Sequence, residues 1–374
     1  MSSYGFNQEG GIERSSLEVA KGITALGTDV TLVAHHVTPE PIPPLRWHPV
    51  HMMRVPSSLV PIVYSRAATR QVDASAFDIL HNQGGCALRR QDVITAHSCH
   101  KAWWALKFQQ HEAARAVLNP LHHTVLHVEK ANYRPGRFRR VIAVSSGVGA
   151  EITEHYAVPP ELITVIPNGV DTARFRPPDR DRVRAELRTE LGYGPEHVVL
   201  LFVGKEFRRK GLRPILEAMP ALPDHTKLLV VGGDTDDSFR ALARDLWVED
   251  RVTFVGHVTD AERYFLAADI FVFPTLYEAF PLVSLEAAAA GLPLLACRVN
   301  GTEELVVPGE NGYFIERHAD SIAAVTRQLV DDPEARRRLG EAASRAADRY
   351  SWQAVSRRTQ EVYDQVLDEK SRGG

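Results

Sequence analysis

Residues 198–297 alternate short apolar runs with segments of helical composition, and this alternation limits the possible folds more than any other feature of the chain. Val198–Val203 and Ile270–Phe273 are continuous apolar runs of strand length. Such runs are typical of parallel strands that are buried on both faces, and the segments between them are long enough for crossover helices. The pattern therefore predicts an α/β structure with a parallel, doubly wound sheet.

The first half of the chain repeats this alternation with shorter runs. Ile12–Leu26 is a predicted amphipathic helix that ends at Gly27. The predicted strands that follow include Asp29–Ala34, Asp92–His97 and Val141–Val144. This half is therefore also predicted to contain a sheet with helices on its faces.

A chain of 374 residues with 44% hydrophobic content can bury a large core and favours two domains. The segment 172–182 is rich in Pro, Arg and Asp and has no apolar period, so it is the expected linker. We expect the first domain over residues 1–175 and the second over 176–350, followed by a last helical segment over 351–374.

The stretch Pro274–Pro293 places two carboxylates in a strand–loop–helix context. Glu278 lies in the predicted loop, and Glu286 lies inside the predicted helix Leu282–Ala290, which stops at Gly291. Backbone amides at the amino end of such a helix favour phosphate, and the carboxylates could bind the hydroxyls of a sugar nucleotide. The alternative is that Glu278 caps the helix and Glu286 is a solvated helix residue.

Two lysines follow another predicted strand. Lys205 and Lys210 come after Val198–Val203, in a segment bracketed by Gly204 and Gly211. One charge pair at 4 Å is worth about 4 kcal/mol at an effective dielectric near 20. Two ammonium groups and the helix amides could therefore stabilise a departing diphosphate without a metal ion. The alternative is that both lysines are solvated surface charges.

Five motifs occur in a fixed order, and singly each is weak. They are Gly10–Arg14, Ile166–Asp171, Phe202–Lys205, Arg208–Gly211 and Pro274–Pro293. Together they resemble family 4 of the retaining glycosyltransferases with the GT-B fold, and the resemblance covers nearly the whole chain. It implies two Rossmann-like, doubly wound domains that face each other across a cleft, with the segment 351–374 crossing back onto the first domain.

The resemblance also implies a full strand before the Gly10-Gly11 loop. Only Met1–Gly5 and a few further residues precede that loop in this sequence. We therefore expect the first, central strand of the N-terminal sheet to be short, and a chain extended upstream by an apolar strand to be more stable.

The resemblance implies roles for the residues that match the motifs. The predicted catalytic residues are His97, Lys205, Lys210 and Glu278. The predicted donor-binding residues are Gly11, Gly204, Phe280, Pro281, Leu282 and Glu286. Lys205 and Lys210 would hold the diphosphate, Glu278 the sugar hydroxyls and Glu286 the ribose. The family commonly has Arg where Lys205 stands, and Lys cannot form the bidentate fork of Arg.

The sequence disfavours other nucleotide-dependent classes. It has no G-x-G-x-x-G after the first strand and no G-x-x-x-x-G-K-[ST], which disfavours a dehydrogenase and a P-loop enzyme. His97, Cys99 and His100 lack a usual zinc spacing. We expect neither a cofactor nor a metal, because the nucleotide sugar is a substrate.

The main hypothesis is therefore a hexosyl-type transferase. It would move a sugar from a nucleoside-diphosphate donor to a hydroxyl of a glycan, a glycolipid or a small molecule, with UDP favoured over GDP as the donor's nucleotide. The alternatives are a GT-B-fold sugar-nucleotide epimerase and a non-catalytic sugar-nucleotide-binding protein. Nucleic acid is not an expected partner.

Cysteine usage and hydropathy favour the cytoplasm. Three cysteines without paired spacing fit a reducing compartment, and no apolar run is long enough to span a membrane. Lys101–Phe108 contains Trp103 and Trp104 between lysines, so it could dock on the inner face of a membrane or line an acceptor groove. Packing of these tryptophans in and around the core is the alternative.

Overall fold

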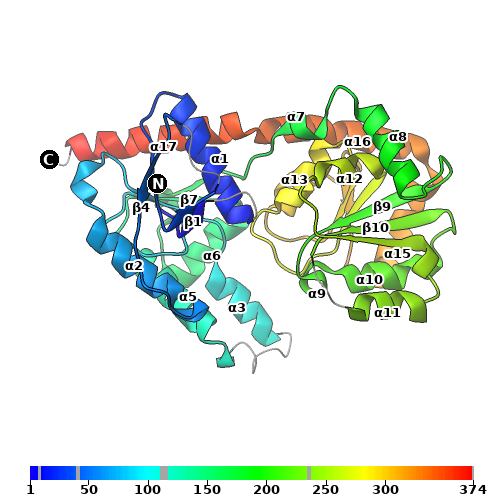
Figure 1. Ribbon diagram of the computed structural model, residues 1–374, viewed down its shortest axis with the longest axis horizontal. Coiled ribbons are helices and arrows are strands. Elements are labelled where there is room, and N and C mark those ends of the chain that lie inside the picture. The colour runs from blue at the N-terminus through cyan, green and yellow to red at the C-terminus, as the bar shows by residue number, and fades with distance from the viewer. Residues whose placement is uncertain (7–9, 39–42, 110–116, 234–236, 373–374) are drawn as a thin grey trace. The chain divides into compact units, whose positions relative to one another are not determined.

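The computed structural model describes residues 1–6, 10–38, 43–109, 117–233 and 237–372. The chain divides into two compact units, each of which contains a parallel sheet covered by helices (Figure 1). The first unit is Met1–Asn168 together with Trp352–Gly374, and the second unit is Gly169–Ser351. No helix in the described part of the chain is both long and apolar enough to cross a membrane.

The second unit is built on one six-stranded parallel sheet with the order β11-β10-β9-β12-β13-β14. Its strands are β9 (Val198–Val203), β10 (Thr226–Val231), β11 (Val252–Gly256), β12 (Ile270–Phe273), β13 (Leu294–Ala296) and β14 (Gly312–Phe314). Every residue of β9 and β12 is buried, as expected for strands with helices on both faces. The order reverses between β9 and β12, so the sheet has its topological switch point there.

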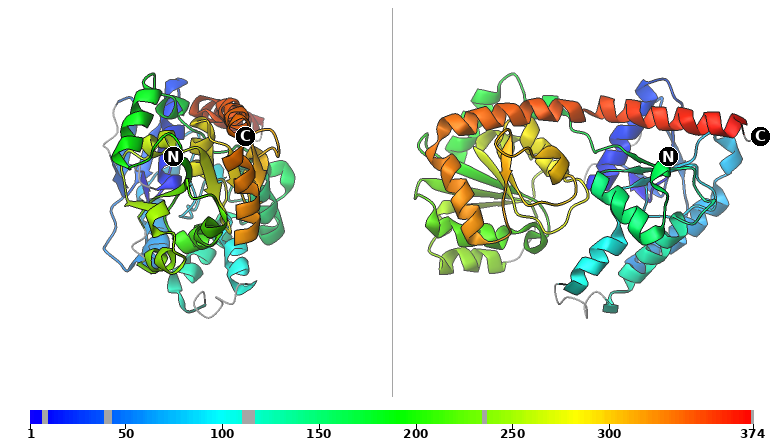
Figure 2. Two further views of the ribbon diagram at one scale, coloured as in Figure 1. Left: turned by 90° about the vertical axis from the view of Figure 1, so that its right-hand side faces the viewer. Right: turned by 180° about the vertical axis from the view of Figure 1, so that it is seen from behind.

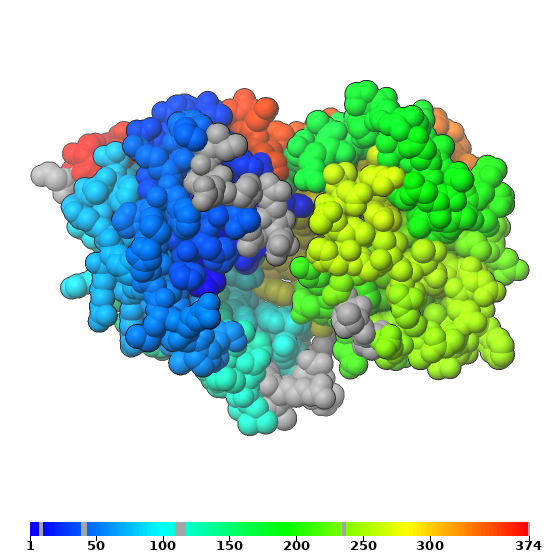
Figure 3. Space-filling view, viewed as in Figure 1, coloured from blue at the N-terminus to red at the C-terminus, as the bar shows by residue number. Residues whose placement is uncertain are grey.

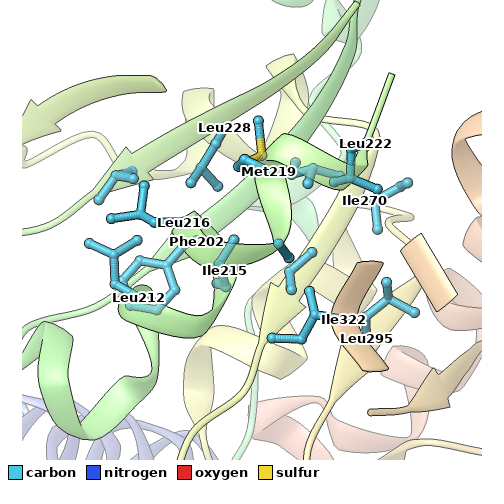
Figure 4. Close-up of a cluster of buried hydrophobic side chains, with 14 of the residues drawn as sticks. Phe202, Leu212, Ile215, Leu216, Met219, Leu222, Leu228, Ile270, Leu295 and Ile322 are labelled. Carbon is cyan, nitrogen blue, oxygen red and sulfur yellow. The ribbon is translucent and has the colours of Figure 1, made fainter. Parts of the chain in front are cut away.

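Helices cover both faces of this sheet. One face carries α10 (Leu212–Ala218), α11 (Asp237–Asp245) and α15 (Ala319–Asp331), and the other carries α8 (Arg180–Glu190), α12 (Glu262–Ala267) and α13 (Leu282–Ala289) (Figure 1). The remaining helices of the unit are α7 (Thr172–Phe175), α9 (Phe207–Lys210), α14 (Thr302–Leu305) and α16 (Pro333–Ala347). Between the sheet and the first group of helices lies a cluster of buried apolar side chains that includes Phe202, Leu216 and Ile322 (Figure 4).

The first unit also has parallel strands, but they form separate ladders with the orders β2-β4 and β5-β6-β7-β8. Its sheet contains β2 (Thr31–Ala34), β4 (Arg46–Pro49), β5 (His81–Asn82), β6 (Val93–Ala96), β7 (Arg140–Ala143) and β8 (Ile163–Val165). Between β2 and β5 the chain pairs only at its first residues, where Ser2 forms parallel bridges to Val33 and Asn82. A separate two-stranded ladder joins β1 (Gly5–Phe6) to β3 (His36–Val37).

Two helices distant in sequence lie side by side on one face of this sheet. They are α1 (Gly11–Ala25) and α17 (Trp352–Arg372), and they share an apolar cluster with β2, β6 and β7 (Figures 1 and 2). The other helices of the unit are α2 (Val60–Gln71), α3 (His100–Gln109), α5 (Pro120–Asn132) and α6 (Ser146–Tyr156). The C-terminal segment therefore returns to the first unit, as the resemblance implies.

The structure divides the chain at Asn168/Gly169 and at Ser351/Trp352, rather than at 175/176 and 350/351. The segment 172–182 belongs to the second unit, where Thr172–Phe175 is helical and a second helix begins at Arg180. Phe175 is buried, and its ring packs edge to face on that of Phe265 with centroids 5.3 Å apart. The burial of Phe175 therefore makes the expected linker, residues 172–182, part of the second unit.

Candidate active site

The candidate site lies at the carboxyl edge of the second unit's sheet, at its switch point. The chain leaves β9 at Val203 and enters the short helix α9, and it leaves β12 at Phe273 and enters the loop before α13. In doubly wound sheets, ligands bind beyond the strand ends where the order reverses. These two segments carry most of the predicted site residues.

Lys210 and Glu278 meet at this edge, although they are far apart in sequence. The Lys210 Nζ atom lies 3.0 Å from Glu278 Oε1, and the two side chains are only 13% and 12% exposed. Lys210 Nζ also lies 4.8 Å from the centroid of the Phe273 ring, the last residue of β12. The ammonium is therefore held between a carboxylate and an aromatic face at the strand ends.

Glu278 accepts hydrogen bonds from two further groups. The Arg209 Nη1 and Thr275 Oγ1 atoms each donate to Glu278 Oε1 at 3.0 Å. Burial lowers the pKa of the Arg209 guanidinium, but the nearby Glu278 and Glu206 carboxylates outweigh that effect and raise the pKa overall. The Glu278 carboxylate is thus fixed by three donors from two segments.

Two glycines allow the lysine to reach this position. A Cβ atom at Gly204 would lie 2.3 Å from Cδ of Lys210, so a side chain there would block the path of the lysine. Gly211 has a φ of 87° and lies against the Pro274 carbonyl, at a point where a Cβ would be 2.2 Å from the oxygen. Glycine is therefore required at both ends of the segment that carries Lys210.

Lys205 differs from Lys210. Its side chain is exposed, and within the described residues it makes no ion pair. The structure thus brings Lys210 and Glu278 together and leaves Lys205 at the surface beside them. Gly204 joins the two lysines to the end of β9.

The start of α13 borders the same edge. Its N-cap residue is Pro281, whose side chain cannot accept a hydrogen bond, and Phe280 before it is buried. Leu282 is the first helical residue, and Glu286 lies in the middle of the helix with 7% of its surface exposed. Glu278 therefore does not cap this helix, and Glu286 is not a solvated helix residue, which excludes the alternative interpretation of both carboxylates.

His97 and Gly11 belong to the first unit. His97 follows β6, and its Nε2 atom lies 3.1 Å from the Oε1 atom of Gln83, which follows β5. Ser16 of α1 donates to the same oxygen at 3.2 Å. Burial lowers the pKa of His97 to about 4, so the imidazole is neutral at neutral pH. Gly11 opens α1 and is exposed.

The other histidines near His97 have partners within the first unit. His81 is buried, with Nδ1 2.6 Å from the Tyr363 hydroxyl and Nε2 2.7 Å from Thr95 Oγ1. His100 Nε2 lies 3.0 Å from His122 Nδ1. No three His, Cys, Asp or Glu side chains converge as a metal site would require, in the part of the chain that the structure describes.

Family models match the two halves of the chain. The model described as "Glycosyltransferase Family 4" matches residues 9–174, and the model described as "Glycosyl transferases group 1" matches residues 183–346. The chain belongs to glycosyltransferase family 4.

Several relatives of this glycosyltransferase carry one name. D-inositol 3-phosphate glycosyltransferase of Corynebacterium glutamicum (strain R) is 32% identical over 241 residues, which are 60% of this chain and 56% of that protein. The protein of the same name from Streptomyces coelicolor is 26% identical over 415 residues, covering 98% of this chain and 90% of its own length. The match to the Corynebacterium protein, which has the higher identity of the two, therefore spans little more than half of that protein's length.

Solved structures of glycosyltransferases share the fold. WaaG, a glycosyltransferase involved in lipopolysaccharide biosynthesis, superposes with a TM-score of 0.79 at 23% identity, over 97% of this chain and 98% of its own. Anabaena Alr3699/HepE in complex with UDP-glucose superposes with a TM-score of 0.74 at 18% identity, over 98% of this chain and 100% of its own. Both units of this glycosyltransferase therefore have the Rossmann-like architecture of the GT-B fold.

Three polar residues at these strand ends were not predicted from the sequence. Arg209 lies inside the motif Arg208–Gly211, but nothing in that motif indicates that its guanidinium contacts Glu278. Thr275 and Gln83 each lie just beyond the carboxyl end of a strand. Because ligands bind beyond such ends, the position of Gln83 directly after a strand could have indicated it, as the position of His97 after β6 does.

Proposed function

We propose that this glycosyltransferase moves a sugar from a nucleoside-diphosphate donor to an acceptor hydroxyl, with retention of the anomeric configuration and without a metal ion. The observation that carries the proposal is the paired Lys210 and Glu278 at the switch point, beside the uncapped start of α13. Lys210 would supply a cation for a phosphate, and Glu278 would supply a carboxylate for hydroxyls. The two charged groups are joined by one hydrogen bond of 3.0 Å.

The second unit would bind the donor. Lys210 would leave the Glu278 carboxylate to hold the diphosphate, with Lys205 as a second cation from the surface. The backbone of Phe280 to Leu282 would contact the phosphate or the sugar at the amino end of the helix, with Leu282 rather than Pro281 as an N–H donor, because proline has no amide hydrogen. Glu278 would accept hydrogen bonds from the sugar hydroxyls, and the buried Glu286 from the ribose.

The first unit would contribute His97 to the sugar and Gly11 to the border of the phosphate and the acceptor. Because the pKa of His97 is lowered to about 4, it would act as a neutral hydrogen-bonding group rather than as a cation. Its Nε2 atom lies 3.1 Å from the Gln83 amide oxygen, so the tautomer that carries a hydrogen on Nε2 would donate to Gln83 and leave Nδ1 as an acceptor.

The proposed chemistry is an attack of the acceptor hydroxyl on the face from which the diphosphate departs. The bond from the anomeric carbon to the phosphate oxygen breaks as the bond to the acceptor oxygen forms, and the departing phosphate takes the acceptor's proton. Glu278 is assigned to hydroxyls in this proposal, so no carboxylate is left for a covalent intermediate. The lysines would stabilise the negative charge of the leaving group.

UDP is the favoured nucleotide and GDP the second candidate. The support for UDP is the UDP-glucose complex of a protein with the same fold. The name of the relatives adds one concrete acceptor to test, D-inositol 3-phosphate.

We also propose a cytoplasmic enzyme that contacts the inner face of a membrane through α3. This helix lies at the surface of the first unit (Figure 3) and carries the exposed Phe108 and Lys101. Lys107 Nζ lies 5.1 Å from the Trp103 ring, so a cation accompanies the aromatic side chain. Tryptophan and lysine together suit a membrane interface. Sedimentation with anionic vesicles would test this, and an absence of binding would refute it.

The experiment that tests the activity begins with a thermal-shift panel of UDP, GDP, ADP and their common sugars. The donor that binds is then incubated with D-inositol 3-phosphate and with other hydroxyl acceptors. Proton NMR of the product reads the anomeric coupling, and a parallel assay contains excess EDTA. An epimerised donor, or a tightly bound donor that never reacts, would overturn the transferase assignment. Inversion would overturn only retention, and activity that Mg²⁺ or Mn²⁺ must restore would overturn only metal independence.

A further inference from the structure

Arg209 immediately precedes Lys210 in α9, and its guanidinium links two carboxylates. Its Nη1 atom lies 3.0 Å from Glu278 Oε1. Its Nε and Nη2 atoms lie 3.0 and 2.8 Å from Glu206 Oε2, and Nη1 also donates to the Tyr277 carbonyl at 2.6 Å. The side chain is 19% exposed. Arg209 therefore joins the turn after β9 to the loop after β12.

The Glu278 carboxylate consequently has two cations on the same oxygen. Lys210 and Arg209 both lie 3.0 Å from Oε1. Glu278 is only 12% exposed, so a loss of all cationic partners would leave a largely buried charge unpaired, which is strongly unfavourable. With two cations present, one can leave without that cost.

The two cations are not equivalent. Arg209 is also held by Glu206 and by the Tyr277 carbonyl, so several hydrogen bonds must break before its guanidinium can move. Lys210 carries a flexible side chain, and its one ion pair within the described residues is with Glu278. Lys210 is therefore the cation that can transfer from the carboxylate to an incoming phosphate.

We propose that Arg209 is a positioning residue that keeps Glu278 neutralised and in place when Lys210 turns to the diphosphate of the donor. This inference rests on the proposed function and names a residue to which that function gives no role. Without Arg209, Lys210 would be the principal counterion of Glu278. The carboxylate and the diphosphate would then compete for one ammonium group, and nucleotide affinity would fall.

The test is a double-mutant cycle on nucleotide binding in the full chain, measured by isothermal titration calorimetry. The probe is UDP, or GDP or ADP if the wild type prefers one of these. The cycle compares the wild type, Arg209→Gln, Glu278→Gln and the double variant. Arg208→Gln is the matched control, because it removes an exposed guanidinium from the same turn. Arg209→Met, which removes the charge but keeps the length of the side chain, is measured in parallel in case Arg209→Gln does not fold.

We expect Arg209→Gln to weaken nucleotide binding about tenfold and Arg208→Gln to change it less than threefold. Glu278→Gln should have little effect when Arg209 is present, but it should restore about tenfold when Arg209 is absent, because it releases Lys210. Arg209→Lys keeps the charge and should bind within threefold of the wild type. The two substitutions are thus predicted to be strongly coupled.

Three outcomes are decisive. If Glu278→Gln changes the affinity by the same factor in both backgrounds, Arg209 acts only through its overall charge, and the inference is wrong. If the double variant binds as weakly as Arg209→Gln, Arg209 either contacts the nucleotide or supports the fold, and the inference is again wrong. If the wild type binds none of the three nucleotides, the proposed function fails instead.

Discussion

Both units contain parallel strands covered by helices, but their interiors differ in chemistry. In the second unit, β9 and β12 are apolar and fully buried, and an extensive apolar cluster lies on one face of the sheet. In the first unit, buried polar side chains stand within and beside the sheet, among them Ser2, His81, Asn82 and Gln83. Similar architectures can therefore be held together by different balances of apolar burial and hydrogen bonding.

Polar contacts in the first unit connect segments that are far apart in sequence. The Nδ1 atom of His81 in β5 lies 2.6 Å from the hydroxyl of Tyr363 in α17. The side-chain Nδ2 of Asn82 donates to Oδ1 of Asn132 in α5 at 3.1 Å. Such contacts specify partners by direction and are costly when a partner is lost. The first unit is thus the one in which single polar substitutions, or protonation, should have broad effects.

In the second unit, polar side chains gather at the carboxyl edge of an apolar sheet. Lys210, Glu278 and Arg209 lie where the strands end, and the residues that precede them on β9 and β12 are apolar. This separation places the apolar interior in the sheet and the polar groups of the candidate site at its edge.

The largest expected effect is the loss of an aromatic side chain from the second unit's interior. Phe202→Ala removes a fully buried ring from the cluster in Figure 4 and should lower the free energy of unfolding by about 3–5 kcal/mol. Urea denaturation measures this. Trp247→Ala is the control, because Trp247 is 92% exposed and its loss should cost about 0.5 kcal/mol or less. Similar losses in both variants would mean that the cluster does not dominate the unit's stability.

Lys210→Ala should have the next largest effect, and it acts on turnover rather than on folding. We expect turnover to fall about a hundredfold, which corresponds to about 2.7 kcal/mol in the barrier, because the proposed role of Lys210 is to stabilise the departing diphosphate. Steady-state kinetics with the donor measures it, and Glu278→Ala should behave similarly. Lys227→Ala, at a lysine whose Nζ contacts a backbone carbonyl, is the control. Near-normal turnover of Lys210→Ala would exclude this lysine from the diphosphate site.

The same difference explains how much of the molecule could be predicted from its sequence. In the second unit, the apolar runs coincide with strands, and β9 and β12 have the predicted bounds. The sequence predicts Lys210 and Glu278 for the same site, but the ion pair between them is seen only in the structure. In the first unit, the predicted strand Asp92–His97 is shortened to Val93–Ala96, and a two-residue strand, His81–Asn82, pairs with it among polar side chains and long-range contacts. Arg209 was missed because its contacts with Tyr277 and Glu278 span 68 and 69 residues of sequence and leave no local pattern.

The first unit should also be the more sensitive to acid. Burial lowers the pKa of His97 to about 4. The pKa of His100 is also lowered to about 4, mainly by burial and further by the nearby charges of His122 and Lys107. Between pH 6.5 and 4 the unfolded chain therefore binds more protons than the folded chain, so stability falls as the pH falls through this window.

For His97 alone, the expected loss at pH 4.5 relative to pH 7 is on the order of 2 kcal/mol. Hydrogen exchange with mass spectrometry, corrected for the intrinsic pH dependence, should show protection lost from the first unit before the second. His97→Gln should reduce this difference, whereas His225→Gln, at an exposed histidine of the second unit, should not. Simultaneous loss of protection in both units would contradict the assignment.

The smallest expected effect concerns two helix starts that differ between the units. In the first unit, α6 follows β7 and is capped by Ser145, whose Oγ accepts a hydrogen bond from the Val148 amide at 3.1 Å. In the second unit, α13 begins after Pro281 without such a cap. Ser145→Ala should lower the free energy of unfolding by about 1 kcal/mol, because the Val148 amide loses its cap, and leave nucleotide affinity unchanged. Ser145→Gly should cost only a few tenths of a kcal/mol, since glycine is tolerated at the cap position. Calorimetric titration of both variants with UDP would separate the two helix starts: a weakened affinity would show that the start of α6 contributes to the donor site, and that the uncapped start of α13 is not the distinction that matters.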